Sequence, residues 1–127
     1  YGISAGIMFY PDSGLLAIST ETDNEYVEPL IQEVYHEIDR LHQEPVSAEE
    51  LTIVRNYMLG EMCRSYESPF SLSDAWIFIA TSGLDDDYFS RSLLAVNEVT
   101  PMEIQDLAQR YLCKETLKEV IAGKKLS

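Results

Sequence analysis

The stretch from Glu44 to Trp76, EPVSAEELTIVRNYMLGEMCRSYESPFSLSDAW, contains two well-marked helix starts. Ser47 is followed three residues later by Glu50, the spacing of a capping box in which each side chain accepts a hydrogen bond from the other residue's backbone N–H. Ser68 precedes Pro69, which combines a capping hydroxyl with a proline at the first helical position. Between the two starts, apolar residues recur every three or four positions, at Leu51, Val54, Met58 and Met62. The stretch therefore predicts one long helix and the start of the next.

Upstream of this stretch, residues 1–22 predict a β-hairpin. Two segments rich in β-branched and aromatic residues, YGISAGIMFY and LLAISTET, flank the turn sequence PDSG. A hairpin alone is only marginally stable, so it needs a larger sheet or helices against it. A helix then follows, because apolar residues recur at helical spacing, at Val27, Leu30, Ile31, Val34, Ile38 and Leu41. It is expected to end before Pro45, since the residue that precedes a proline avoids the helical conformation.

Downstream, three more helices and a strand are predicted. The helix that starts at Pro69 is expected to stop at Gly83, since glycine readily takes the left-handed conformation that ends helices. The acidic run at 85–87 favours the start of a short helix, where carboxylates suit the positive end of the helix dipole. Thr100-Pro101-Met102-Glu103 repeats the capping-box pattern. Leu117 to Ala122 reads as a last short strand.

The order of two strands, five helices and one strand predicts an α+β fold. We expect an antiparallel sheet, made of the hairpin plus the C-terminal strand, covered on one side by about five helices. A length of 127 residues fits a single domain over residues 1–127. Because the chain begins inside a strand and without Met, we expect a fragment of a larger α+β domain that lacks its N-terminal part. An uncovered sheet edge would invite a homodimer.

The composition is strongly acidic. The 22 acidic and 9 basic residues give a net charge of −13, which disfavours nucleic acids and anionic membrane surfaces as partners. We find no apolar run of membrane-spanning length, so membrane insertion is not expected. Two cysteines are too few for a disulfide framework, and Cys63, near an apolar helix face, is predicted to be a small core residue. Nothing in the sequence indicates a compartment.

A search for catalytic chemistry finds none. His36 and His42 lie six residues apart on one predicted helix, which fits neither H-E-x-x-H nor H-x-x-E-H. The sequence has no CxxC pair, no G-x-S-x-G and no glycine-rich phosphate loop. The three Asp at 85–87 lack the spacing of a calcium loop and suit a helix start. The residues alone therefore predict a non-catalytic module with no catalytic residue and no metal ligand.

Five segments follow one another along the chain: EPVSAEEL, NYMLGEMCRSYESPF, SGLDDDYF, VTPMEIQDLAQRYL and the terminal VIAG. In their content and order they resemble the insulinase/pitrilysin family of zinc metallopeptidases, the inverzincins. The hairpin YGISAGIMFYPDSGLLAISTET is similar to the pair of strands that precedes the first of these helices in the family. The resemblance covers essentially the whole chain.

The resemblance implies that the chain is the latter part of a companion, non-catalytic domain. The family's zinc motif lies in a homologous catalytic domain or subunit, so zinc is expected in that partner and no cofactor in this chain. The parent protein would then be a zinc metalloendopeptidase, and this chain would close the chamber and contact the peptide substrate. Tyr1 falls where active relatives have a Tyr that positions substrate, although an aromatic residue packed at a strand end is an equal alternative.

Two other functions stay open. The chain could be a structural or assembly domain of a family member without peptidase activity. It could also be a self-contained enzyme that uses Asp and Glu at its acidic helix starts. That last possibility predicts converging carboxylates with displaced pKa values, and the spacing of the acidic residues does not indicate such a site.

Overall fold

The computed structural model describes residues 2–10 and 12–124. Two strands come first, β1 (Ile3–Tyr10) and β2 (Ser13–Thr20), and five α-helices follow. The helices are α1 (Val27–Gln43), α2 (Ala48–Arg64), α3 (Pro69–Ser82), α4 (Tyr88–Glu98) and α5 (Pro101–Tyr111), with short 3₁₀ turns at Asn24–Tyr26 (η1) and Lys114–Thr116 (η2). The predicted α+β class, the hairpin and all five helices are confirmed.

The hairpin is regular along its whole length. β1 and β2 pair antiparallel in one continuous register, from Ile3 opposite Thr20 to Tyr10 opposite Ser13. Because side chains alternate between the two faces of a strand, one face, here called the apolar face, carries Ile3, Ile7, Phe9, Leu16 and Ile18. All eight residues of β1 are exposed.

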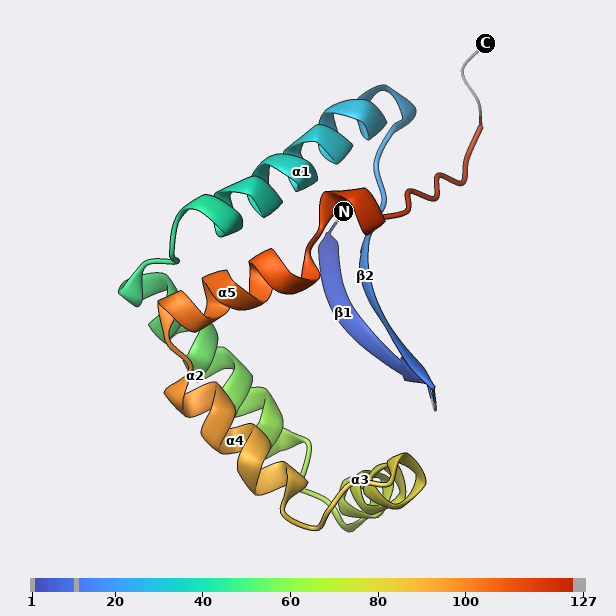
Figure 1. Ribbon diagram of the computed structural model, residues 1–127. Coiled ribbons are helices and arrows are strands. Elements are labelled where there is room, and N and C mark those ends of the chain that lie inside the picture. The colour runs from blue at the N-terminus through green and yellow to red at the C-terminus, as the bar shows by residue number, and fades with distance from the viewer. Residues whose placement is uncertain (1, 11, 125–127) are drawn as a thin grey trace.

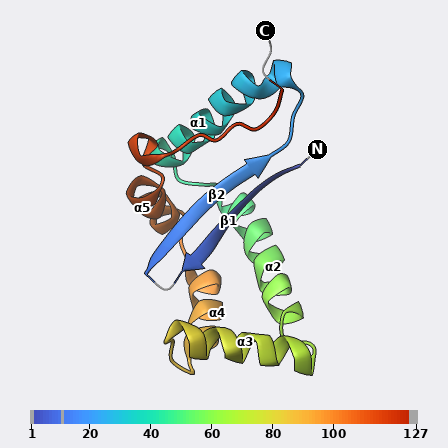
Figure 2. The ribbon, with the colours of Figure 1, turned by 90° about the vertical axis from the view of Figure 1, so that its right-hand side faces the viewer.

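The predicted third strand does not form. Residues 117–122 have no ladder with either strand, and the described sheet has two strands only. The segment 114–124, called the C-terminal segment below, instead runs along α1 (Figure 2). Polar side chains hold it there: Tyr35 Oη donates to the Glu119 carboxylate at 2.7 Å, and Asn24 Nδ2 donates to the Lys124 carbonyl at 3.0 Å. These bonds to η1 and α1 take the place of the predicted bonds to the sheet.

The helices form an open arc around one side of the hairpin (Figure 1). α1 packs on α5 and α2 packs on α4, whereas α3 meets the hairpin tip through Phe78, whose ring centroid lies 6.4 Å from that of Phe9. The helices therefore lie on one side, as predicted, but they do not bury the sheet. Only four described hydrophobic side chains are buried: Ile38, Leu51, Ile79 and Ala108.

The accessible surface is large for the chain's mass. It measures 10194 Å², whereas a compact monomer of 14.4 kDa is expected to expose about 6,800 Å². Much of the excess is apolar, and it includes Phe70, Trp76 and Ile77 on α3. A surface of this kind is typical of a chain that functions against a partner.

The helix ends follow the predicted local chemistry. Thr100 and Glu103 form a complete capping box, and Gly83 ends α3 with a φ of 65° in the left-handed region. Ser68 Oγ accepts from the Ser71 N–H at 3.0 Å. At Ser47 only half of the predicted box forms among the described contacts, since its Oγ accepts from the Glu50 N–H at 3.1 Å without the reciprocal bond.

We predict that Thr100→Ala lowers the Tm by roughly 3–6 °C at neutral pH, because the variant loses the N-cap of α5. Hydrogen bonds from the Thr100 backbone and hydroxyl hold the pKa of Glu103 below its usual range. A lowered folded-state pKa gives a contribution that is present above the unfolded pKa and is lost as pH falls through the folded pKa. The Tm difference between wild type and variant should therefore shrink as the pH falls from 7 into the acid range.

The control for this prediction is Thr81→Ala. The Thr81 hydroxyl donates to the Ile77 carbonyl inside α3 and caps no helix end. Alanine has the higher helix propensity, so the Tm of this variant should stay constant or rise slightly. Scanning calorimetry of both variants at several pH values is the measurement. A Tm loss in Thr100→Ala that stays the same down to acid pH would contradict the role given to Glu103.

Candidate functional site

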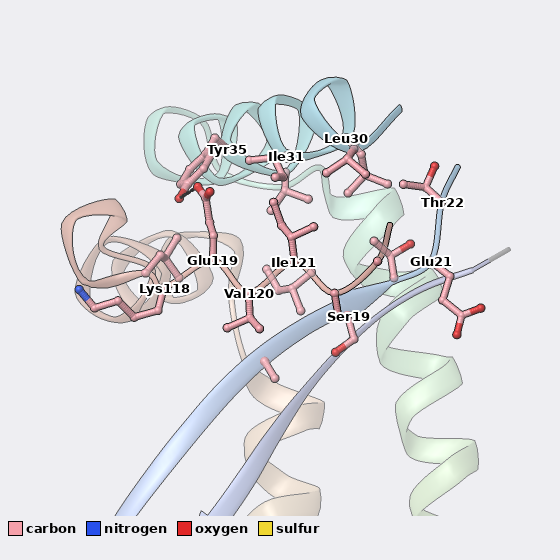
Figure 3. Close-up of a pocket in the computed structure, with 18 of the residues that line it drawn as sticks. Ser19, Glu21, Thr22, Leu30, Ile31, Tyr35, Lys118, Glu119, Val120 and Ile121 are labelled. Atoms are coloured by element: carbon pink, nitrogen blue, oxygen red, sulfur yellow. Dashed lines mark hydrogen bonds between the residues drawn. The ribbon is translucent and has the colours of Figure 1, made fainter. Parts of the chain in front are cut away.

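A groove of about 1100 Å³ lies between β2, α1 and the C-terminal segment (Figure 3). Six consecutive residues of β2, 15–20, line it. Consecutive residues point to opposite faces of a strand, so the edge of β2, and not one of its faces, borders the groove. The apolar stripe of α1 forms the second wall, with Val27, Leu30, Ile31 and Val34.

The third wall is the C-terminal segment, in which two apolar side chains are exposed. Val120 is 90% exposed and Ile121 is 63% exposed, although both line the groove. Figure 3 places residues 119–121 between α1 and β2. Apolar side chains of α1 and the C-terminal segment thus line the groove, together with polar ones such as Lys118 and Glu119.

A polar clasp fixes the C-terminal segment to α1. Tyr35 donates to Glu119, and that hydrogen bond raises the pKa of Tyr35, with smaller contributions from burial and from the Glu119 charge. Lys114 pairs with Asp39, and its Nζ lies 5.5 Å from the centroid of the Tyr35 ring. The clasp joins residues as much as 84 positions apart and holds the outer wall in place.

Charge is distributed unevenly around the groove. Asp12 is the only charged residue among the first twenty, whereas Glu21, Asp23, Glu25 and Glu28 follow within eight residues. Of these carboxylates only Glu21 lines the groove, and the C-terminal segment adds Lys118, Glu119 and Lys124. The groove is therefore bounded by an uncharged strand along β2 and by charges of both signs elsewhere. A surface of this kind suits an extended, largely apolar peptide.

Of the two histidines, His42 has a structural role. The His42 ring Nε2 lies 3.0 Å from the Ala108 carbonyl, and the His42 carbonyl accepts hydrogen bonds from the Gln105 and Gln109 side-chain amides at 2.9 and 2.7 Å. These contacts join the end of α1 to α5. His36, on the same helix, is exposed.

The described residues do not fit a zinc ion. No group of three or more His, Cys, Asp or Glu side chains that could hold a metal occurs in residues 2–10 and 12–124. Two of the acidic residues at 85–87 face Arg91, whose Nη2 lies 3.4 Å from Asp87 and 3.9 Å from Asp85. These ion pairs lie where the chain enters α4, whose N-cap residue is Asp87.

Two other predictions concern single residues. Cys63 is exposed, so its assignment to the core was wrong: no other described element covers α2 at this position. Tyr1, the predicted substrate contact, lies outside the described residues.

In the part of the chain that the structure covers, no helix has the length and apolar character needed to cross a membrane.

Comparison with known proteins gives one match. Residues 1–58 match the family model described as the Peptidase M16 inactive domain, which supports the resemblance to the insulinase/pitrilysin peptidases. The matched part comprises the hairpin, α1 and most of α2, and so includes two of the three walls of the groove. No curated protein and no solved structure gives a significant match.

Proposed function

Because residues 1–58 of the chain belong to the Peptidase M16 inactive-domain family, we propose that the chain forms part of the wall of a peptidase chamber and contacts the peptide substrate there. An inactive domain of this family implies association with a catalytic partner domain. Peptide hydrolysis and the zinc ion belong to that partner in this proposal. This chain contributes binding surface in the same proposal.

The observation that carries the proposal is the exposed edge of β2 in an apolar groove. A free strand edge can bind an extended peptide through main-chain hydrogen bonds, while alternate side chains of the peptide enter pockets on either side. Here the side chains of α1 and the C-terminal segment supply the pockets. Recognition through the backbone tolerates many sequences, which suits a peptidase that acts on varied peptides.

The test uses the assembled peptidase, with this chain and its catalytic partner domain together. Ile18 lines the groove and is 37% exposed. We expect Ile18→Lys to raise the KM for a peptide substrate roughly tenfold and to leave kcat within about twofold, because the change affects binding and leaves the chemistry on the partner. The matched control is Ile53→Lys, which places the same charge on α2, at a residue that is 65% exposed and does not line the groove.

Tyr1 is the second substrate contact in this proposal, and it receives the same assay. Tyr1→Ala should raise KM while kcat changes little. Tyr26→Ala, at an exposed tyrosine in η1, is the control for the loss of a phenol ring. If KM stays at the wild-type value in both Ile18→Lys and Tyr1→Ala, the chain makes no substrate contact and the proposal fails.

A second candidate function is assembly without substrate contact. The observation that favours it is the surface of 10194 Å², which a partner would cover. In this case the groove and Tyr1 variants would leave KM unchanged, whereas polar substitutions on α3, such as Trp76→Gln, would release the chain from its partner. Co-purification of the two domains separates the two candidate functions.

A further inference from the structure

We propose that a substrate peptide lies in the groove as a strand between two edges, paired with β2 on one side and with the C-terminal segment on the other. This inference rests on the proposed function and goes beyond it, because it gives the C-terminal segment backbone hydrogen bonds to the peptide. It also restricts the substrate to a peptide that is extended and free of proline along the groove, since proline has no N–H to donate.

Both edges of the groove have backbone groups without a backbone partner among the described residues. In the described sheet, β2 pairs with β1 alone. In the C-terminal segment, the Leu117 N–H donates to the Lys114 carbonyl at 3.2 Å, and no backbone-to-backbone bond within the described chain involves residues 118–122. Residues 15–20 of β2 and residues 116–124 line the same groove. Each backbone can therefore bond to a strand that lies between them.

The two edges run in the same direction. β2 ends at Thr20 and leads into η1, which begins at Asn24. The C-terminal segment contacts Tyr35 through Glu119 and then Asn24 through the Lys124 carbonyl, so it also runs toward η1. Figure 2 shows both running toward the same end of α1. A peptide that is antiparallel to β2 is therefore antiparallel to the C-terminal segment too, and antiparallel pairs are slightly more stable than parallel ones.

The clasp keeps the C-terminal segment available for a peptide. Tyr35 and Asp39 on α1 hold the segment through Glu119 and Lys114, and these contacts use side chains only. Anchoring through side chains leaves the backbone N–H and C=O groups of the segment for another strand. Val120 lies within this stretch and is 90% exposed, so a peptide strand beside it would also cover apolar surface.

The charge and the size of the groove fit a neutral, apolar peptide. The described charged residues that line it are Glu21, Lys118, Glu119 and Lys124, two acidic and two basic. The lining is thus neutral in sum, although the whole chain carries −13. A strongly charged peptide therefore meets no net opposite charge in the lining. The volume of about 1100 Å³ exceeds that of the usual small-molecule site, about 300–1,000 Å³, and suits a peptide.

Hydrogen exchange of the assembled peptidase, followed by mass spectrometry, tests the proposal. The probe is a peptide of about eight residues that alternates valine and threonine between a terminal lysine and a terminal glutamate. It is added after chelation of metal ions, so that it stays intact. We expect it to slow exchange at about half of the amides in 15–20 and in 117–122, because alternate N–H groups of a strand face each side. Exchange in α5, of which no described residue lines the groove, should stay unchanged.

Proline variants separate backbone hydrogen bonds from side-chain contact. Val120→Pro and Ile121→Pro each remove one N–H, and consecutive N–H groups of a strand face opposite sides. One of the two variants should therefore raise the peptide concentration that gives half-maximal slowing in 15–20 by roughly fivefold to tenfold, the loss of about one hydrogen bond. Val120→Ala and Ile121→Ala keep the N–H and are the matched controls, for which we expect a change of less than about threefold.

The outcomes separate this inference from the proposed function. Slowed exchange in 15–20 but not in 117–122 would overturn the second edge and leave the proposed function in place. The same holds if both proline variants bind the peptide as tightly as their alanine controls. Slowed exchange in neither segment would overturn both the second edge and the proposed contact with substrate.

Discussion

Ile38→Ala lowers the free energy of unfolding by about 2–5 kcal/mol, the range for truncation of a fully buried isoleucine. Ile38 is 3% exposed and belongs to α1, which packs on α5. Ala108 on α5 is 6% exposed. Only two other described hydrophobic residues are buried, so few other packed side chains compensate for the cavity. Urea unfolding followed by circular dichroism measures the change.

The control for Ile38→Ala is Ile53→Ala. Ile53 is 65% exposed on α2, so the same truncation there should change the free energy of unfolding by no more than about 0.5 kcal/mol. Equal, small effects at both positions would mean that the α1–α5 contact adds no stability. A large effect at Ile38 alone would locate the core of the chain at this contact. It would also connect the core to the groove, because the preceding turns of the same helix form the groove wall.

The elements that could be predicted from the sequence are those that depend on nearby residues. The box between Thr100 and Glu103, the cap at Ser68 and the left-handed Gly83 each need only a few neighbouring residues, and each forms. The hairpin is also local, since its turn brings together strands that are adjacent in sequence. The apolar stripe of α1 was equally visible, and it forms a wall of the groove.

The features that could not be predicted depend on distant residues. Residues 117–122 have the composition of a strand, but a strand also needs a partner with free hydrogen-bonding groups at the right distance. The bond from Tyr35 to Glu119 joins residues 84 positions apart and directs the segment to α1, and no local pattern reveals it. The prediction for Cys63 was wrong for a related reason: an apolar helix face is buried only where another element covers it, and Cys63 lies on an exposed part of α2.

The groove contains one part that could be predicted from the sequence and one that could not. Its α1 wall follows from helical periodicity, whereas its third wall exists because a predicted strand lies beside the helix and not in the sheet. A third strand on β2 would have occupied the edge that we propose for the peptide. The most informative part of the candidate site is therefore the part at which the prediction from sequence was wrong.

Arg55→Ala is expected to lower the free energy of unfolding by about 2–4 kcal/mol, because it removes two charge-assisted hydrogen bonds to a helix end. Arg55 on α2 donates from Nε to the Val96 carbonyl at 3.1 Å and from Nη2 to the Val99 carbonyl at 2.5 Å. These carbonyls lie at the C-terminal end of α4, where the last turn has no intrahelical donors and the helix dipole is negative. A guanidinium satisfies both requirements.

The surroundings of Arg55 make this loss costly. An apolar surface pocket of about 280 Å³ adjoins the side chain, and its other lining residues are Leu51, Val54, Met58, Ala95, Val96, Val99 and Ile104. Their side chains contain no group that could donate to the released carbonyls. Alanine would therefore leave both carbonyls without a protein donor and widen the pocket. Both effects weaken the packing of α2 against α4.

Two further variants separate the geometry of the guanidinium from its charge. Arg55→Lys keeps the charge but cannot donate to two carbonyls with the fixed fork of a guanidinium, so it should recover only part of the loss. Arg40→Ala removes an arginine that is 54% exposed and pairs with Glu37 three residues away, and it should cost less than about 0.5 kcal/mol. Thermal and urea unfolding of all three variants are compared with wild type. If Arg55→Ala is as mild as Arg40→Ala, the bonds to α4 add no net stability; if Arg55→Lys equals wild type, charge alone is sufficient.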